Sequence, residues 1–157
     1  MFLWKVVKKR IIRRAIKPKN TTYLQNKELA RIVITKRLQF FNQLGEFVYH
    51  RVAIRDQRRC WGSCSSKGNL NFSYKLLFLP PCLRDYIIVH ELCHLKVLNH
   101  STSFWAEVEL RMPDYVARMQ HLRFIEKSTG TSIIALKHYQ ASHTAKDCHQ
   151  CAESQIN

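Results

Sequence analysis

Two histidines four residues apart, His90 and His94, lie in an apolar stretch of the chain, and Glu91 directly follows the first. On a helix, residues i and i+4 lie one above the other, so both imidazoles can reach a single ion. Zinc accepts such nitrogens at about 2.0–2.1 Å. The alternative is a pair of core histidines with satisfied hydrogen bonds, but burying two imidazoles and a carboxylate without partners is costly. The pattern therefore favours a buried helix that carries a metal site.

The position of Glu91 points to a catalytic role rather than to a further ligand. One residue after a metal-binding histidine, its carboxylate is placed to reach a water on the metal instead of the metal itself. Zinc lowers the pKa of such a water, and a carboxylate can take its proton as the water attacks a peptide carbonyl. We therefore predict Glu91 as the base of a zinc-dependent peptidase.

A catalytic zinc ion takes three protein ligands and keeps one position for water. His100, six residues after His94, is the best candidate for the third ligand. Asn99 precedes it, and asparagine tolerates the left-handed conformation that ends helices, so the chain can turn His100 back toward the metal. A carboxylate of the next helix, Glu107 or Glu109, is the competing ligand, and His100 would then be an exposed histidine at a helix end.

The spacing of apolar residues predicts an α+β domain. Apolar residues at three- and four-residue intervals predict helices, and short runs of β-branched and aromatic residues predict strands. We expect an N-terminal helix, a small antiparallel sheet, a helix that carries the predicted site and is opened by proline, and C-terminal helices. The expected helices span 22–44, 81–98, 102–112 and 115–127, and the expected strands span 47–55, 59–63 and 70–73.

The chain is strongly basic, with 26 Lys and Arg against 11 Asp and Glu and a formal net charge of +15. Such a field favours acidic partners, meaning nucleic acid, anionic lipid or acidic peptides, although a basic surface can also serve only solubility. Residues 1–19 form a basic arm with eight Lys or Arg and no acid. We expect this arm to pack its apolar residues on the domain, or to lie as an amphipathic helix on a membrane or on nucleic acid.

Six cysteines are present, but nothing marks the chain for secretion, and no segment reaches the roughly 20 apolar residues of a membrane helix. We therefore expect free thiols and a cytoplasmic protein. Residues 128–157 form a polar tail in this interpretation. In it, Cys148 and Cys151 are half of a zinc-knuckle pattern that His138 or His143 could complete, and the alternative is a disordered tail with incidental cysteines.

Longer motifs stand in order along residues 20–126: Arg55–Phe72, Leu79–Pro81, Asp85–His94, Asn99–Ser101, Phe104–Trp105 and Met112–Tyr115. Together they closely resemble the YgjP-like metallopeptidases. The resemblance implies a zincin-like α+β domain over residues 20–127, zinc as cofactor, and hydrolysis of peptide bonds in a protein or peptide substrate. It also implies a strand near the cleft at Trp61, whose edge could hold an extended peptide. The family looks related to SprT-like and WLM proteases, which cut proteins attached to DNA.

Some positions depart from related patterns. Val97 stands where metzincins, which share the histidine spacing, carry glycine, so the chain is not placed among them. Cys60 stands where we expect serine or another small residue in relatives. An oxyanion stabiliser is also expected, because the tetrahedral intermediate of peptide hydrolysis carries developing negative charge. Tyr115, His121 and Arg59 are the candidates.

These observations predict a zinc metallopeptidase with His90, His94 and His100 as ligands and Glu91 as base. The alternative is a basic nucleic-acid-binding protein with a structural zinc site, in which a cysteine or carboxylate closes the metal as fourth ligand. Glu91 argues against this alternative, because a structural site needs no base beside its first ligand. A third possibility is a peptidase held at a membrane surface by residues 1–16.

Overall fold

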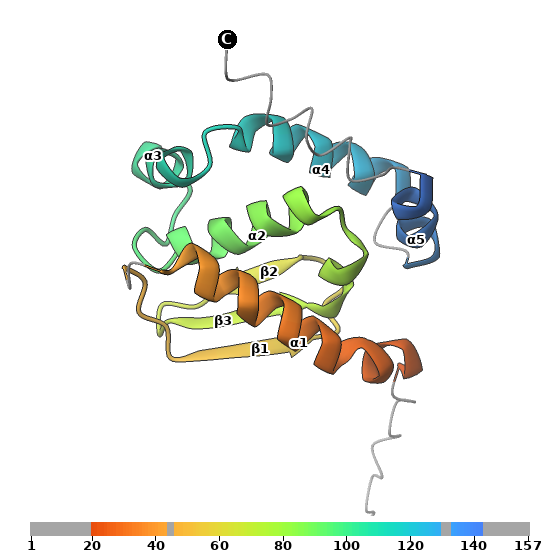
Figure 1. The fold of residues 1–157 in the computed structure, drawn as a ribbon. Helices are drawn as coiled ribbons and strands as arrows, with labels where there is room; N and C mark the ends of the chain where they lie inside the picture. Colours follow the sequence, from red (N-terminus) through yellow and green to blue (C-terminus); the bar gives the residue numbers. More distant parts are fainter. Residues whose placement is uncertain (1–19, 44–45, 130–132, 143–157) are drawn as a thin grey trace, which may run out of the picture.

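A small three-stranded sheet lies on one side of the computed structural model, which describes residues 20–43, 46–129 and 133–142 (Figure 1). Its strands are β1 (Arg51–Arg55), β2 (Gly62–Cys64) and β3 (Asn69–Ser73), in the spatial order β1-β3-β2. β2 pairs antiparallel with β3, whereas β1 pairs in parallel with it. With five helices beside this mixed sheet, the chain has the α+β architecture that the sequence predicts.

The expectation of a purely antiparallel sheet is wrong for the pair of β1 and β3. The chain reverses direction between β1 and β2 and again between β2 and β3, so β3 runs in the same direction as β1. Antiparallel pairing throughout would require β2 to lie in the middle, next to β1. Instead β3 occupies the middle, and β2 is left at an edge of the sheet with one free side.

Two backbone hydrogen bonds close the turn between β2 and β3. The Ser65 N–H donates to the Asn69 carbonyl over 3.0 Å, and the Gly68 N–H donates to the Ser65 carbonyl over 2.9 Å. Gly68 has a φ of 69°, in the left-handed region that glycine enters without a side-chain clash. The turn thereby fixes the register of β2 on β3.

Helix α1 (Thr21–Phe41) matches the predicted first helix except that it ends three residues earlier than 44. The Asn20 side chain caps it by accepting the N–H of Tyr23 over 3.3 Å. Ala30, Ile34 and Leu38 recur every four residues and are fully buried, so they form the stripe that packs on the rest of the domain.

Helix α2 (Pro81–Cys93) carries the His-Glu-x-x-His pattern but ends five residues before the predicted Leu98. Leu95 and Lys96 donate their N–H groups three residues back, to Leu92 and Cys93, so the last turn tightens and the chain leaves the helix. The expected left-handed turn at Asn99 is wrong, because Gly68 alone has a positive φ in the described part of the chain.

The short helix η1 (Tyr74–Phe78) follows the sheet, and helices α3 (Thr102–Arg111) and α4 (Tyr115–Thr129) follow α2 close to their predicted bounds. Helix α5 (Ile133–Ser142) was not predicted, since the sequence pattern weakens after Gly130. Within α5, Leu136 is fully buried and the Lys137 Nζ lies 5.3 Å from the ring centroid of Phe78 in η1. One buried side chain in so short a helix leaves too little periodicity to detect.

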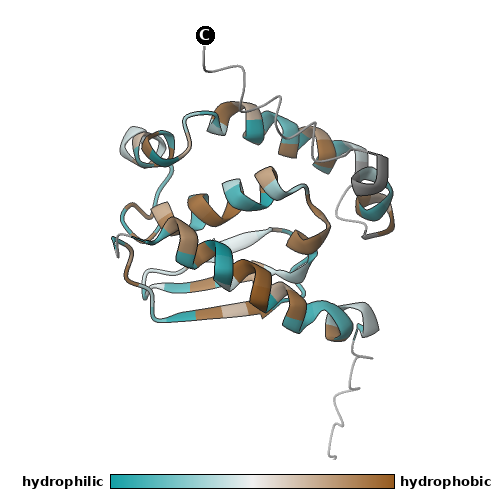
Figure 2. Ribbon diagram, viewed as in Figure 1, coloured by the Kyte–Doolittle hydropathy of each residue, from teal (hydrophilic) through white to brown (hydrophobic). Residues whose placement is uncertain are grey.

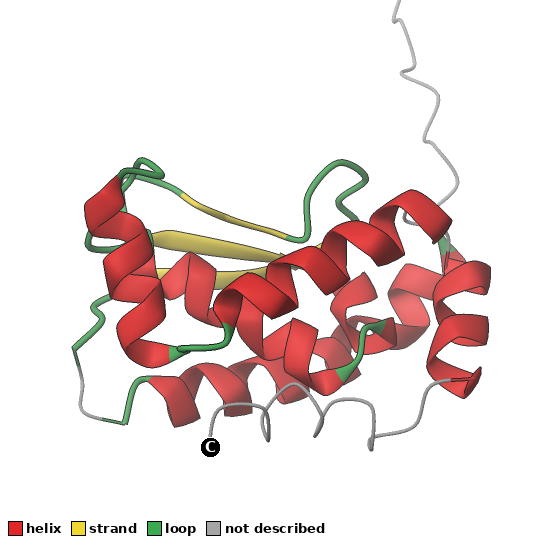
Figure 3. Ribbon diagram, turned by 90° about the horizontal axis from the view of Figure 1, so that it is seen from above, coloured by secondary structure: helices red, strands yellow, loops and turns green. Residues whose placement is uncertain are grey.

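The helices form layers on one face of the sheet (Figures 1 and 3). α1 contacts β1 and α2, while α2 contacts β2. α3 and α4 contact α2 from its other side, so α2 lies between the sheet and the C-terminal helices (Figure 1). Most of α2 is correspondingly apolar (Figure 2).

Several predictions concern residues outside the described part of the chain. They are the basic arm over 1–19 and the metal-binding pattern of His143, Cys148 and Cys151. Cys60, Cys64, Cys82 and Cys93 are free thiols. Among the described residues, no helix has both the length and the apolar character needed to cross a membrane.

The buried stripe of α1 yields a prediction for stability. Leu38→Ala should lower the free energy of unfolding by about 2–5 kcal/mol, because it leaves a cavity in the core. Ile32→Ala is the matched control, since Ile32 lies on the same helix but is 65% exposed, and a change within about 0.5 kcal/mol is expected. Urea denaturation followed by circular dichroism measures both, and equal losses would contradict the assignment of the buried face.

Candidate metal centre

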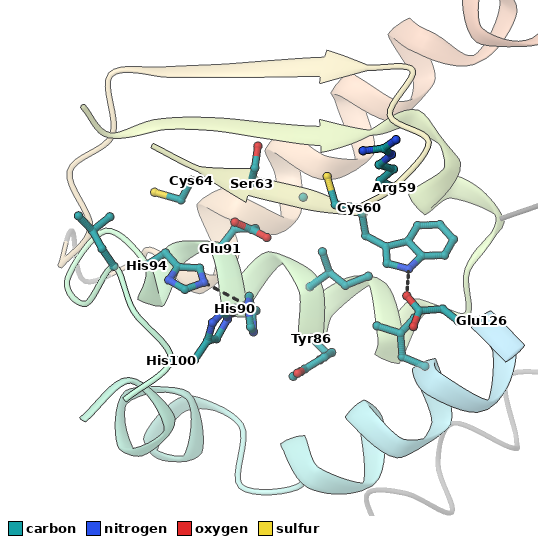
Figure 4. Close-up of a pocket in the computed structure, with 15 residues that line it drawn as sticks. Arg59, Cys60, Ser63, Cys64, Tyr86, His90, Glu91, His94, His100 and Glu126 are labelled. Carbon is teal, nitrogen blue, oxygen red and sulfur yellow. Dashed lines mark hydrogen bonds between the residues drawn. The ribbon is translucent and has the colours of Figure 1, made fainter. Parts of the chain in front are cut away.

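Three histidines bring their Nε2 atoms together at the end of α2 (Figure 4). The Nε2 of His90 lies 3.2 Å from that of His94 and 3.1 Å from that of His100. Two ligand nitrogens about 2.0–2.1 Å from one tetrahedral zinc ion would be separated by roughly 3.3 Å. Both separations match this value, and the ligand atoms of all three histidines lie within 4.8 Å of one another, so one ion could bridge them.

The surroundings of the histidines favour their neutral form, which is the form that binds metals. Burial, together with the neighbouring His94 and His100, lowers the pKa of His90 to about 3. Burial also lowers the pKa of His94, against the opposing effect of its hydrogen bond to Val97. At neutral pH both residues therefore present an uncharged ring.

The backbone orients one of the rings directly. The Nδ1 of His94 lies 3.0 Å from the carbonyl oxygen of Val97, and in the tautomer with the proton on Nδ1 it donates to that carbonyl. The lone pair of its Nε2 then faces the other two histidines, which is how proteins commonly prepare a metal-binding imidazole. The Nδ1 of His90 is buried without a hydrogen-bond partner.

Aromatic side chains of α3 pack against all three imidazoles. The ring centroid of Phe104, a fully buried residue of α3, lies 4.8 Å from that of His90, 4.3 Å from that of His94 and 4.9 Å from that of His100. Trp105 stacks on His100 with a centroid distance of 5.7 Å. Packing by α3 thus helps to set the orientation of rings that come from α2 and from the following loop.

Glu91 lies between α2 and β2, next to the histidines (Figure 4). It is 6% exposed, and its Oε2 has no hydrogen-bond partner. Burial raises the pKa of its carboxyl to about 8. Without a cation nearby, the carboxyl therefore holds its proton at neutral pH, whereas a cation held by the histidines would favour the carboxylate. Perturbed pKa values of this kind are common at functional sites.

Gly62 in β2 makes room for this carboxylate. A Cβ atom at Gly62 would lie 2.7 Å from both Cγ and Oε1 of Glu91, closer than such atoms normally approach. Cys64 is two residues after Gly62 in β2, so the alternation of the strand turns it toward the same face. Cys60 precedes the strand. Both thiols line the cleft, and burial, followed by the charge of Glu91, raises the pKa of each, to about 11 for Cys64.

The cleft above the histidines has a volume of about 460 Å³ and runs between β2 on one side and α2 and α4 on the other. At one end the Trp61 Nε1–H donates to Oε1 of Glu126 in α4 over 2.7 Å (Figure 4). Ile87 and Leu122, which are buried, also line the cleft. The lining therefore combines apolar side chains with charged ones such as Arg59 and Glu126.

The structure separates the candidates for the third ligand. His100 lies with His90 and His94, as the sequence predicts. Glu107 instead forms ion pairs with Lys96 and Arg111. Neither Glu107 nor Glu109 belongs to the group of possible ligands that the described residues form.

The three candidates for an oxyanion stabiliser lie in different places. Arg59 lines the cleft. Tyr115 stacks on Trp105 with a centroid distance of 5.5 Å, and the Nε2 of His121 lies 2.5 Å from the hydroxyl of Tyr139 in α5. Tyr115 and His121 are therefore not part of the cleft lining.

The sequence interpretation missed Tyr86 and Gly62 as residues of the site. Tyr86 is four residues before His90, and the spacing that relates His90 to His94 places Tyr86 on the same side of α2. Its ring centroid lies 5.9 Å from that of His90, and burial raises the pKa of its hydroxyl to about 12. Its spacing was a usable signal, whereas the role of Gly62 depends on the contact between β2 and α2.

Comparisons with known proteins identify the family of the chain. The YgjP-like metallopeptidase domain matches residues 6–124. Among solved structures, the metallopeptidase zymogen of Pyrococcus abyssi abylysin is 32% identical, with 50% of this chain and 78% of that chain covered and a TM-score of 0.45. No curated protein matches the chain. Because the family match spans most of the sequence, the chain belongs to the YgjP-like metallopeptidase family.

Proposed function

We propose that the protein is a zinc-dependent metallopeptidase, in which His90, His94 and His100 hold the metal and Glu91 is the catalytic base. The observation that carries this proposal is the meeting of three imidazole Nε2 atoms beside one buried, unpaired carboxylate. Family membership supports the hydrolysis of peptide bonds. The donor set supports zinc, since three histidines form a common catalytic zinc site that keeps one position open.

A zinc ion, when bound, polarises a carbonyl and acidifies water. The protein supplies the remaining parts of the reaction. Glu91 has a free Oε2 within the cleft wall, so it can take a proton from the attacking water and hold it for transfer to the leaving nitrogen. Because Glu91 is shielded from solvent, few bulk water molecules compete for that oxygen.

The free edge of β2 supports an extended protein or peptide as the substrate. β2 pairs with β3 on one side only, and Gly62, Ser63 and Cys64 line the cleft. Unpaired backbone groups at such an edge can add one more strand through main-chain hydrogen bonds. A bound peptide would then pass alongside Glu91 and the histidines.

The alternative of a structural zinc site has less support. A structural site needs a fourth protein ligand. Within residues 20–43, 46–129 and 133–142, no cysteine or carboxylate joins the three histidines in the candidate group. Binding of nucleic acid and a cytoplasmic location remain predictions from the charge and the cysteines.

Replacing the proposed base tests the mechanism. Glu91→Gln should lower kcat/KM for an unfolded protein substrate by about 10²–10⁴-fold, because the amide cannot accept the proton. Zinc content should stay at the wild-type level, as measured by atomic emission on the dialysed protein. Glu109→Gln is the control, since Glu109 is exposed on α3. Full activity in Glu91→Gln would remove this residue from the mechanism.

Replacing the third ligand tests the metal site. His100→Ala should weaken zinc affinity by more than about 100-fold, since even residues that only orient ligands are worth about 10–100-fold. Competition with a chromophoric chelator measures the affinity. His50→Ala is the control, as His50 is exposed and outside the histidine group. Unchanged affinity in His100→Ala would show that another group completes the site.

Filling the space at Gly62 tests whether the position of Glu91 matters. Gly62→Ala should lower kcat/KM by roughly 100-fold. The added methyl group would lie too close to the Glu91 side chain and displace its carboxylate, and a displacement of about 1 Å can cost that much in rate. Zinc affinity should be retained, since the three atoms nearest to the added methyl group all belong to Glu91 and none to a histidine. Ser63→Ala, one residue along β2, controls for general effects on the strand. Wild-type kinetics in Gly62→Ala would contradict the close contact.

A further inference from the structure

Four charged side chains meet beside the loop that joins α2 to α3. The Nζ of Lys96 lies 3.3 Å from Oε2 of Glu46 and 3.3 Å from Oε2 of Glu107. Arg111 pairs with the same two carboxylates through its two terminal nitrogens. We call Glu46, Lys96, Glu107 and Arg111 the ion cluster. In it each cation contacts both anions, so the removal of one side chain affects all four.

The ion cluster rests on Phe47. Lys96 Nζ lies 5.2 Å and Arg111 Cζ 4.7 Å from the centroid of this ring, within the range of cation–π attraction. Phe47 is buried, and the Asn42 side chain at the end of α1 binds both its N–H and its carbonyl, over 2.9 and 2.8 Å. The ion cluster therefore connects the loop to a fixed point on α1.

Members of the ion cluster lie on both sides of His100 in the sequence. Lys96 lies between His94 and His100, whereas Glu107 and Arg111 belong to α3, which begins at Thr102. His100 is an exposed residue outside any helix or strand, so no regular backbone pattern fixes its position. Its ring nevertheless lies beside those of His90 and His94, so contacts with other segments help to define the conformation of the loop.

A network of this kind is stronger than an isolated surface ion pair. Single exposed pairs contribute little, but several charges with good geometry can act together. The Arg111 side chain is only 14% exposed. Hydrogen bonds from Arg111 and then from Lys96 lower the pKa of Glu46, as expected for a carboxylate that both cations contact.

We propose that the ion cluster is a positioning device, which holds the loop between α2 and α3 so that His100 completes the metal site. This inference rests on the proposed three-histidine site. None of the four side chains belongs to the lining of the cleft or to the histidine group, so they act through His100 rather than on the substrate. They are positioning residues and not catalytic ones.

The test measures zinc affinity in Lys96→Met, which keeps an unbranched side chain over Phe47 but removes the charge. We expect affinity to fall on the order of tenfold in a chelator competition, the scale of residues that orient ligands. Glu107→Gln is a second variant with the same expected direction, in case the first does not fold. Lys96→Arg should restore the affinity, because it returns the cation.

A matched control comes from a second ion pair on aromatic rings. Arg37 binds Asp85 through two hydrogen bonds of 2.7 Å and lies 4.5 Å from the ring centroid of Phe40. It joins α1 to α2 without contacting the loop of His100. Arg37→Met should lower the melting temperature yet leave zinc affinity within about twofold. If the ion cluster served only stability, Lys96→Met would likewise lower the melting temperature and leave zinc affinity unchanged.

A double-mutant cycle decides whether the effect passes through His100. In a His100→Ala background, Lys96→Met should cause no further loss of zinc affinity, because the ligand that it positions is gone. The proposal is overturned if the loss is the same in both backgrounds, or if Lys96→Met and Glu107→Gln bind zinc like the wild type. Wild-type protein that takes up no zinc would instead overturn the proposed metal site itself, so the two failures are distinguishable.

Discussion

The burial of α2 between the sheet and the C-terminal helices is the constraint on which the remaining structure depends. Nine of its 13 residues are buried, among them the carboxylate of Glu91. An unpaired buried carboxylate and an unpaired buried imidazole nitrogen on one helix cost stability. A chain carries such groups where they are used, and a cation among the three histidines would offset much of the cost.

The same burial explains how the cleft is built. α2 lies close enough to β2 that the residue opposite Glu91 has no room for a side chain, and glycine occupies that position. On the other side of α2, α3 packs against it, and Phe104 of α3 contacts all three imidazoles. The hydrogen bond from Trp61 to Glu126 then joins the two walls at one end. The three histidines, Glu91 and the free edge of β2 are thus brought together by the two neighbours of one helix.

Three errors in the sequence interpretation have separate physical causes. The sheet was expected to be antiparallel, yet β3 and not β2 occupies its middle, and the alternation within each strand does not encode that order. α2 was extended to Leu98 because apolar spacing continues there, but hydrogen bonds to Leu92 and Cys93 end it earlier. α5 escaped notice because Leu136 alone marks its buried side within the described side chains. The strand order depends on pairing between distant segments, whereas the end of α2 depends on hydrogen bonds within its own last turn and α5 carries too weak a local signal.

Local sequence was sufficient to establish the helix of the metal centre and two of its candidate ligands, because His90 and His94 are related by the geometry of a single helical turn. It also indicated Glu91 as a base and the α+β character of the domain. Contacts between distant segments were needed for the rest. The position of His100, and not Glu107, beside His90 and His94 depends on the conformation of the loop between α2 and α3, and the room for Glu91 depends on Gly62 in a strand. Periodicity encodes which face of a helix is buried, but not which residue of another segment will lie opposite it.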